Sequence, residues 1–348
     1  MQRKGILRFL VVLFISFFIL LYNGNKIIKK LTEIDVTEEE TPIFNEGYIF
    51  DYDKTEENLT QTVVETPENE NSNEDVMESV QTATGAVKGK IFTSYASPYA
   101  GSTSYSGVYL KNNTTTDINL KSLLESKLSF EIKSGDKPQV LIMHTHTTES
   151  YMMSDSDVYT ESFTSRTTDD NKNMVKIGEI IAQKLNNAGI KTLHAKKHHD
   201  YPQYNGSYGR SANTVTEYLK KYPSIKVVLD IHRDAISKNT SDKVKLVTEI
   251  EGKKAAQVML VMGSETGNVK NHSKWQENLK LAVKLQNLLA EKYPTLARPI
   301  RLVSSKYNQH LTTGSLLIEV GTDANSLEEA CYSAELLGNT ISKLLKQL

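Results

Sequence analysis

The feature that most constrains the fold is a series of short apolar runs separated by segments with helical periodicity. Three of the runs, at 139–143, 225–231 and 315–320, read QVLIM, IKVVLDI and SLLIEV. Such runs are typical of strands that are buried on both faces, and helices of 10–15 residues between them favour parallel pairing. We therefore predict an α/β fold: a mostly parallel sheet covered by helices on both faces. In such a sheet the ligand site lies beyond the carboxyl ends of the strands.

Weaker patterns complete the predicted order of elements. Val175, Ile177, Ile181 and Leu185 lie broadly on one side of a helix that Gly189 would end. The segments 244–250 and 256–262 look like two strands joined by a hairpin at Glu251-Gly252. A further strand is predicted at 191–194, and helices at 118–127, 174–187, 212–221, 279–292 and 327–345.

The N-terminus carries a basic segment followed by the uncharged run FLVVLFISFFILLY at 9–22. Counted from Gly5, with Arg8 reaching back to the headgroups, this run approaches the ~20 residues that a membrane-spanning helix requires. The competing interpretation is a cleaved signal peptide, but no small-residue cleavage site follows. We expect residues 1–30 to be an uncleaved single-pass anchor, with the large domain after it outside the cytoplasmic membrane.

The region that follows is rich in Glu, Thr, Asn, Asp and Ser, with sparse apolar residues and no period. A segment of this composition cannot bury enough apolar surface to offset the entropy lost on ordering. We therefore expect residues 31–90 to be a flexible acidic linker and residues 91–348 to form one domain. As a random coil the linker would reach some 40 Å from the membrane.

Charge and cysteine content exclude several classes. The chain has 41 basic and 42 acidic residues, a balance that gives no support to nucleic-acid binding. The single cysteine, Cys331, lies in a predicted helix and is expected to be a small buried side chain. A protein outside the cytoplasm without a disulfide is stabilised by its core, to which a bound metal can add.

Chemically reactive residues follow three of the predicted strands. The first strand runs into His144-Thr-His146-Thr-Thr-Glu149, the second into His232-Arg233-Asp234, and the third contains Glu319 near its end. If the strands are parallel, these groups gather at one edge of the sheet. A catalytic zinc typically takes three protein ligands from histidine and carboxylate, leaving the fourth position for water.

The predicted zinc ligands are His146, His232 and Glu149. His144 is either a ligand in place of His146, a group behind the ligands, or a packed histidine at the end of a strand. Glu161 and Asp170 are the alternative carboxylates.

The remaining roles concern acid–base chemistry and orientation. Glu319 interrupts an apolar strand and is the candidate general acid/base, the alternative being a carboxylate paired with a basic side chain. Asp230 and Asp234 flank His232 and would orient its imidazole, although Asp230 could instead bind a neighbouring loop. Arg233 would bind substrate or polarise its carbonyl, with a structural ion pair as the equal alternative.

Other histidines and aromatic residues are assigned lesser roles. His199 and Asp200, in the segment HAKKHHD, are expected to be rim contacts only, and His272 and His310 ordinary loop histidines. The side chains predicted to line a groove for a sugar–peptide polymer are Tyr204, Tyr208 and Arg210.

Four segments carry a family resemblance. VLIMHTHTTESY, HHDYPQYNGSYGRSANTV, VVLDIHRDA and LLIEVGTDANSLEEA, in this order after an anchor and an acidic linker, resemble the stage II sporulation protein P family. That family is similar to zinc-dependent N-acetylmuramoyl-L-alanine amidases. The resemblance places His146, rather than His144, at their first ligand, His232 at their third ligand and Glu319 at their catalytic glutamate. The segment TTDDNKN departs from their pattern, in which the middle ligand, a glutamate, stands just ahead of the first helix.

The resemblance implies an amidase-like fold and a function. The enzyme would cleave the amide between N-acetylmuramic acid and L-alanine in peptidoglycan, with endopeptidase action on cross-links, during engulfment in sporulation. Its partners would be the stage II sporulation proteins D and M, and its location the septal or engulfing membrane. The alternative function is a wall-binding scaffold with a degenerate site that recruits other hydrolases. A two-histidine iron oxygenase is disfavoured, because an exported chain has no evident source of reduced iron.

Overall fold

The structure is a computed structural model that describes residues 48–49, 85–133 and 135–348. Most of the predicted linker and the whole predicted anchor lie outside these residues. Within the described ranges, no helix is both long and apolar enough to cross a membrane. The first long strand begins at Val87, a few residues before the domain boundary expected from composition.

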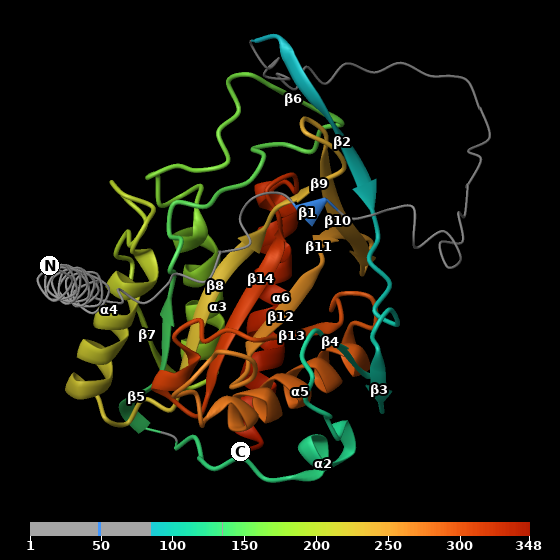
Figure 1. Cartoon of the computed structure of the whole chain (residues 1–348). Coiled ribbons are helices and arrows are strands. Elements are labelled where there is room, and N and C mark those ends of the chain that lie inside the picture. The colour runs from blue at the N-terminus through green and yellow to red at the C-terminus, as the bar shows by residue number, and fades with distance from the viewer. Residues whose placement is uncertain (1–47, 50–84, 134) are drawn as a thin grey trace, which may run out of the picture. The chain divides into compact units, whose positions relative to one another are not determined.

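The larger of two sheets has eight strands, and it places the residues of interest (Figure 1). Its centre is formed by three adjacent parallel strands, of which β8 lies between β14 and β5. In order across the sheet the strands are β3 (Thr103–Tyr105), β4 (Val108–Asn112), β13 (Ile300–Val303), β12 (Val258–Gly263), β14 (Ser315–Thr322), β8 (Val227–Asp234), β5 (Gly135–Met143) and β7 (Ile190–His194).

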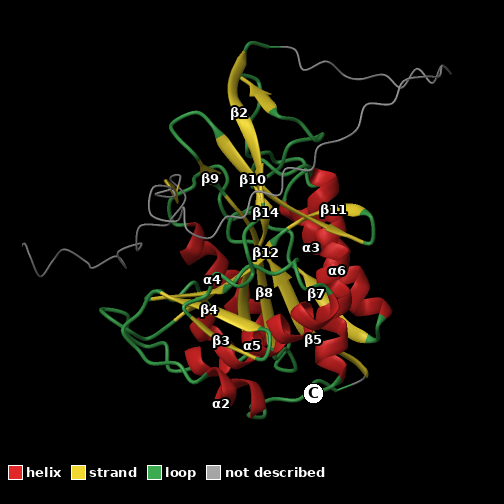
Figure 2. Cartoon of the chain, turned by 90° about the vertical axis from the view of Figure 1, so that its right-hand side faces the viewer, coloured by secondary structure: helices red, strands yellow, loops and turns green. Residues whose placement is uncertain are grey.

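Helices cover both faces, as predicted, and alternate residues of each strand face opposite ways. Ile142, Leu229 and Ile318 belong to the main core on one face of the sheet. Leu141 and Val228 pack with Val215 of α4 on the other face. Figure 2 shows α3 and α6 together on one side of the sheet. That side carries α3 (Met174–Asn187), α5 (Trp275–Lys292) and α6 (Leu327–Lys346), and the other carries α4 (Ser207–Lys221) and the 3-10 helix η2 (Gln309–Leu311). The short α2 (Leu120–Glu125) precedes β5.

The prediction of a mostly parallel sheet was wrong, because both sheets contain antiparallel as well as parallel pairs. β12 runs antiparallel to β14, and β3 antiparallel to β4. The reason is the path of the chain. The predicted strand at 256–262 is divided at Gln257. The residues before it belong to β11 (Lys253–Ala256) of the smaller sheet, and β12 enters the larger sheet beside the carboxyl end of β14. Starting from that edge, β12 can only run opposite to β14.

The smaller sheet joins the larger at the carboxyl end of β14. Thr322 Oγ1 donates to the Val244 carbonyl of β10, and Asn325 Nδ2 to the Leu246 carbonyl. The predicted hairpin is confirmed, with Glu251 and Gly252 at φ 52° and 75° in its turn. The strands are β1 (Tyr48–Ile49), β9 (Ile236–Ser237), β10 (Lys243–Ile250), β2 (Val87–Ser94) and β6 (Val158–Thr160), with β11 (Lys253–Ala256) paired to β10.

The edge strand β7 is closed by a side chain of the preceding helix. The Asn186 amide at the end of α3 accepts from the Thr192 N–H at 3.0 Å and donates to the Thr192 carbonyl at 3.3 Å. Both backbone groups that this residue presents at the open edge are therefore satisfied within the molecule.

Candidate functional site

The predicted convergence of three strand ends is confirmed. β14, β8 and β5 are neighbouring parallel strands, so their carboxyl ends meet at one edge of the sheet. Glu319 lies directly opposite His232 in the register of β14 and β8. The imidazoles of His146 and His232 are 5.3 Å apart between ring centres and nearly perpendicular, at 82°.

Glu149 completes a cluster of buried side chains with these two histidines. Its Oε2 lies 3.6 Å from His232 Nδ1. The residues His146, Glu149 and His232 are 3% exposed or less, although they are polar or charged. Burying such groups together is costly unless each has a partner or binds a cation, so the cluster indicates a functional role.

The loop that carries His146 is held from below by Asp230. Its Oδ1 accepts from the Thr145 N–H at 2.8 Å, and its Oδ2 accepts from the Thr145 hydroxyl at 2.7 Å. Oδ1 also lies 2.9 Å from His232 Nε2, although this pair lacks hydrogen-bond geometry. Asp230 thus meets both predictions made for it, because it faces His232 and binds the neighbouring loop. Asp234 instead pairs with Arg298 at 2.8 Å.

The charges in the cluster are set by burial and by near neighbours. Burial alone would lower the pKa of His232, but Asp230 and Glu149 raise it well above its ordinary value. Burial would raise the pKa of Glu149, but Arg233 and His232 together hold it well below its usual range. Burial lowers the pKa of His146 to about 3, which leaves this imidazole neutral. A neutral imidazole and an ionised carboxylate are the forms that bind a metal, so His146 and Glu149 are in the right forms, whereas His232, held protonated by Asp230 and Glu149, would release a proton on binding.

Glu319 has the properties of a proton-transfer group. Burial raises the pKa of Glu319 to about 8. The charges of Asp234 and Glu149 add to this effect, and the charge of His232 opposes it. Its Oε2 is buried and has no hydrogen-bond partner. A carboxyl group that titrates near neutral pH and keeps one oxygen unengaged is suited to take up and release a proton.

The donor set fits a divalent metal by its chemistry. Two ligands of one tetrahedral zinc lie roughly 3.4 Å apart, close to the 3.6 Å between His232 Nδ1 and Glu149 Oε2. Glu319 Oε2 is buried without a hydrogen-bond partner, so it remains available to a group bound beside the two histidines. Among the described residues, however, no three histidine, cysteine or acidic side chains are yet close enough to form a complete metal-binding group.

His144 is not available as a ligand in this structure, which corrects that prediction. Its Nδ1 lies 3.0 Å from the Ile231 carbonyl, to which it donates, and its Nε2 lies 2.8 Å from His194 Nε2. Since Nδ1 must carry the proton, Nε2 of His144 accepts and His194 donates. The imidazole points under α3, where Gly178 leaves room for it. His146 is the histidine that faces His232.

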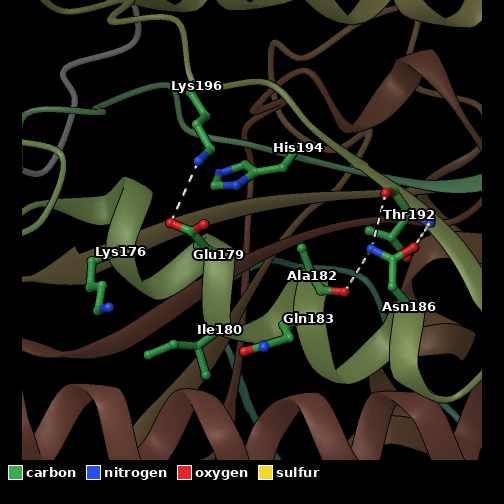
Figure 3. Close-up of a pocket in the computed structure, with 9 residues that line it drawn as sticks. All are labelled: Lys176, Glu179, Ile180, Ala182, Gln183, Asn186, Thr192, His194 and Lys196. Carbon is green, nitrogen blue, oxygen red and sulfur yellow. Dashed lines mark hydrogen bonds and ion pairs between the residues drawn. The ribbon is translucent and has the colours of Figure 1, made fainter.

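His194 also lines a hollow beside the edge of the sheet, between α3 and β7 (Figure 3). Its volume is about 410 Å³. The figure shows Lys196 reaching toward Glu179 across its mouth, at 3.5 Å. None of the predicted site residues lines this hollow, so it is separate from the cluster at the strand ends.

Arg233 takes the structural alternative. Its guanidinium donates to the carbonyls of Ser150 and Ser165 and lies 3.8 Å from Glu149 Oε1. The side chain is 4% exposed and is directed into the loop, so a role in polarising substrate finds no support in its position.

The three predicted groove residues are divided between two roles. Tyr204 stacks on His146 with ring centres 4.7 Å apart and planes at 11°, and Tyr208 meets the same imidazole edge-on at 5.6 Å. Arg210 is engaged elsewhere, because its guanidinium donates to the carbonyls of His199, Asn205 and Gln203. It shapes the loop that carries Tyr204, and the prediction of substrate contact needs this correction.

Sequence reasoning missed a network behind Glu149. Asp200 was expected at the rim but is 6% exposed, and it accepts from Thr148 N–H and hydroxyl. Arg166 lies 2.6 Å from Asp200 and 3.5 Å from Glu149, and its guanidinium stacks over Tyr204 at 4.8 Å. The sequence does contain a signal for this network, namely the two polar segments HHD and HTHTTE. Buried polar side chains need hydrogen-bond partners, and two such segments can supply them to each other.

Two other histidines differ from expectation. His199 is fully buried, and its ring nitrogens contact the His144 carbonyl and the Thr214 hydroxyl. His272, expected in an ordinary loop, is fully buried as well, 6.3 Å from His310 between ring centres. His198 pairs with Asp170 at 2.7 Å, which occupies one of the alternative carboxylates. Glu161, the other, is exposed.

Fold and site together define an α/β protein with imidazoles and carboxylates gathered at the carboxyl ends of adjacent strands. A model of the stage II sporulation protein P (SpoIIP) family matches residues 20–342, and the chain belongs to that family. The Stage II sporulation protein P of Bacillus subtilis (strain 168) is 31% identical over 227 residues, which are 61% of this chain and 52% of that protein. The matched region thus spans about half the length of the relative.

Several solved structures are similar at low identity. The N-acetylmuramoyl-L-alanine amidase AmiC2 of Nostoc punctiforme is 13% identical, covers 62% of this chain and 98% of its own, and has a TM-score of 0.35. The amidase Ami1 of Mycobacterium smegmatis is also 13% identical, over 62% and 100%, with a TM-score of 0.34. An amidase of Clostridium difficile 630 is 16% identical over 61% and 95%, with a TM-score of 0.33. Likeness at this level has no bearing on the activity of the chain.

Proposed function

We propose that the chain is a peptidoglycan hydrolase of sporulation that cleaves the amide between N-acetylmuramic acid and L-alanine, with peptide cross-links as a second substrate. The observation that carries the proposal is the position of Glu319. It lies opposite His232 at the edge where three parallel strands end, with one buried oxygen unengaged and a pKa raised to about 8. Membership of the SpoIIP family supports it.

The residues around Glu319 divide the work of hydrolysis. The Glu319 carboxylate would take a proton from the attacking water and pass it to the leaving amine, because a group that titrates near neutral pH can do both. Asp230 holds the loop of His146 and faces His232, and so fixes the two imidazoles relative to each other. Tyr204 and Tyr208, which pack around His146, offer aromatic faces to a sugar ring.

His146, His232 and Glu149 would hold a zinc ion. Bound there, zinc supplies a Lewis acid and lowers the pKa of bound water toward neutrality. What the chain itself contributes is a neutral His146, an ionised Glu149 and a rigid, buried loop around them.

The test uses purified sacculi and the isolated chain. We expect wild-type protein to release peptides from sacculi and a chelator to stop the release. Glu319→Gln should lower the rate by about 10²–10⁴-fold while retaining bound zinc, because only the proton-transfer group is lost. Full activity of a metal-free preparation would refute the metal, and full activity of Glu319→Gln would refute the assignment of Glu319.

One observation favours a second function, that of a wall-binding scaffold. Glu149 lies within 3.5 Å and 3.8 Å of two arginines, and the described residues hold no complete three-ligand group. A scaffold would bind sacculi without cutting them and would contain much less than one metal ion per chain. Metal analysis together with sedimentation on sacculi therefore separates the two functions.

The setting proposed for this activity is the outer face of the cytoplasmic membrane. The predicted anchor at 1–30 and linker at 31–90 would hold the domain at 91–348 near the wall at the sporulation septum. The proposed partners are peptidoglycan and the stage II sporulation proteins D and M. Protease accessibility of the domain in intact protoplasts tests the orientation, and co-purification from sporulating cells tests the partners.

A further inference from the structure

One short segment beside the candidate site is exposed although both of its ends are fixed. Residues 201–206 read YPQYNG and follow Asp200, which is buried. Asp200 accepts from the Thr148 N–H at 3.1 Å, in the loop that carries His146. Toward the other end, the Tyr204 ring stacks on the His146 imidazole with ring centres 4.7 Å apart. The segment therefore crosses the rim of the site between two fixed points.

The backbone of this segment is held by one side chain of α4. The guanidinium of Arg210 donates to the carbonyl of Gln203 and, at 3.0 Å, to that of Asn205. Its Nε donates to the carbonyl of His199, the residue before Asp200, at 2.6 Å. These bonds order the backbone before any ligand arrives, so binding to this segment costs little conformational entropy.

Tyr201 is the large side chain that this segment leaves uncovered. It is 59% exposed, and Pro202 beside it is exposed as well. Tyr204 and Tyr208, in contrast, pack against His146 and are only partly exposed. Because three residues separate Tyr201 from Tyr204, their Cα atoms lie at most about 11 Å apart. The Tyr201 ring is therefore accessible to a ligand at the rim of the site.

The composition of the segment indicates the kind of ligand. Residues 201–209 contain no charged side chain. Gln203 and Asn205 are exposed, and their side-chain amides can donate to and accept from hydroxyl groups. The Tyr201 ring has apolar faces and a polar tip, which suits a sugar ring with C–H groups on its faces and hydroxyl groups at its edge. An acidic peptide would instead require cationic side chains.

We infer that Tyr201 is a specificity-determining residue that stacks on a sugar ring of the glycan strand, beside the sugar whose amide is cut. The inference rests on the proposed function for the bond that is cleaved. It adds the class of substrate, which is a glycan strand of several sugars rather than a single muropeptide. A substrate too short to reach Tyr201 would be cleaved with a higher KM.

The experiment compares a soluble disaccharide muropeptide with a longer soluble glycan that carries the same peptide, with KM expressed per scissile amide. With the full chain in detergent, wild type should show a lower KM for the longer substrate. Tyr201→Ala should raise that KM by about 3- to 10-fold and leave the KM of the short substrate unchanged. Its kcat should change by less than about twofold, because stacking stabilises the ground state and the transition state alike.

Two variants serve as controls. Tyr201→Phe should keep the wild-type KM values, because stacking requires the ring and not the hydroxyl group. Tyr99→Ala removes a tyrosine that is 63% exposed in the loop between β2 and β3, and it should leave both KM values unchanged. Tyr201→Ala should also melt at the wild-type temperature, because the side chain that it removes is exposed.

The outcomes separate this inference from the proposed function. If wild type cleaves both substrates with equal KM, or if Tyr201→Ala raises both KM values alike, Tyr201 does not bind the neighbouring sugar and the inference fails. If Tyr201→Ala lowers kcat on both substrates, Tyr201 acts through the loop of Tyr204 and the inference fails as well. If wild type cleaves neither, the proposed function fails. Calorimetric binding of both substrates then still tests Tyr201, because a preference for the longer one that disappears in Tyr201→Ala supports the inference, and an unchanged preference overturns it.

Discussion

Replacing Gly178 in α3 by alanine should destabilise the protein, although glycine to alanine in a helix ordinarily does the opposite. A Cβ at Gly178 would lie 2.7 Å from His144 Cε1 and Nε2 and 2.7 Å from His194 Nε2. These two imidazoles are bound to each other at 2.8 Å, and neither is the flexible end of a long chain. The added methyl group must therefore separate them or push α3 away from the sheet.

The magnitude follows from three contributions. Alanine gains about 1 kcal/mol of helix propensity. Overpacking costs about 1–3 kcal/mol, and the lost hydrogen bond between the histidines about 1 kcal/mol. The net loss is about 1–3 kcal/mol, which for a domain of this size lowers Tm by roughly 2–12 °C.

Gly209 in α4 provides the matched control. A Cβ there meets nothing within 4 Å, so Gly209→Ala should stabilise by about 0.5–1 kcal/mol. Thermal unfolding followed by circular dichroism measures both variants against wild type. If Gly178→Ala melts at or above the wild-type temperature, the packing of His144 under α3 is not as described. If both variants lose stability alike, the effect does not come from the histidines.

Three further predictions concern stability. Tyr151→Phe removes a buried donor 2.7 Å from the Val320 carbonyl and should cost about 1–2 kcal/mol in urea unfolding; an unchanged midpoint would contradict the bond. Gly321→Ala should cost about 1–3 kcal/mol of stability, because φ is 68° and the new Cβ would lie 2.7 Å from the Cβ of Ala256. An undiminished Tm would mean that the backbone after Glu319 accepts alanine without strain. Burial holds the pKa of His272 at about 4, so its neutral form stabilises the fold above pH 6.5 and that contribution is lost as pH falls toward 4. His272→Asn should lose less stability than wild type between pH 7 and pH 5, and equal losses would refute this role.

Local signals explain what could be predicted from sequence. The helix at 174–187 was predicted to the residue, because its apolar period and Gly189 act over a few neighbouring positions. The structure adds a capping side chain, Asn173, at its start. The three strand ends were found for a similar reason, since buried parallel strands read as continuous apolar runs. Strands β3, β4 and β13 were missed because they are short; β3 and β4 form a local hairpin, and β13 pairs with β4 across a long stretch of sequence.

The candidate site likewise contains some residues that could be predicted from sequence and others that could not. His146, His232 and Glu319 stand at strand ends, so their position predicted that they would converge; the preference for His146 over His144 came from the family resemblance. The burial of Asp200, and the contact of Arg166 with it, depend on segments 34 residues apart that meet only in the fold. The choice between His144 and His146 likewise depends on His194, which is 50 residues away from His144, and on the space left by Gly178. Periodicity carries no information about such contacts.

The amide of Asn186 has a consequence for how copies of this protein behave when they are concentrated. A strand with unsatisfied backbone groups at the margin of a sheet is a template on which a second chain can add, and many sheets joined in this way become fibrous deposits. Here the margin at Thr192 is occupied by a side chain of the same molecule, so neighbouring copies find no backbone there to pair with. At this position the sheet is closed to the addition of a further strand without a dedicated partner to shield it.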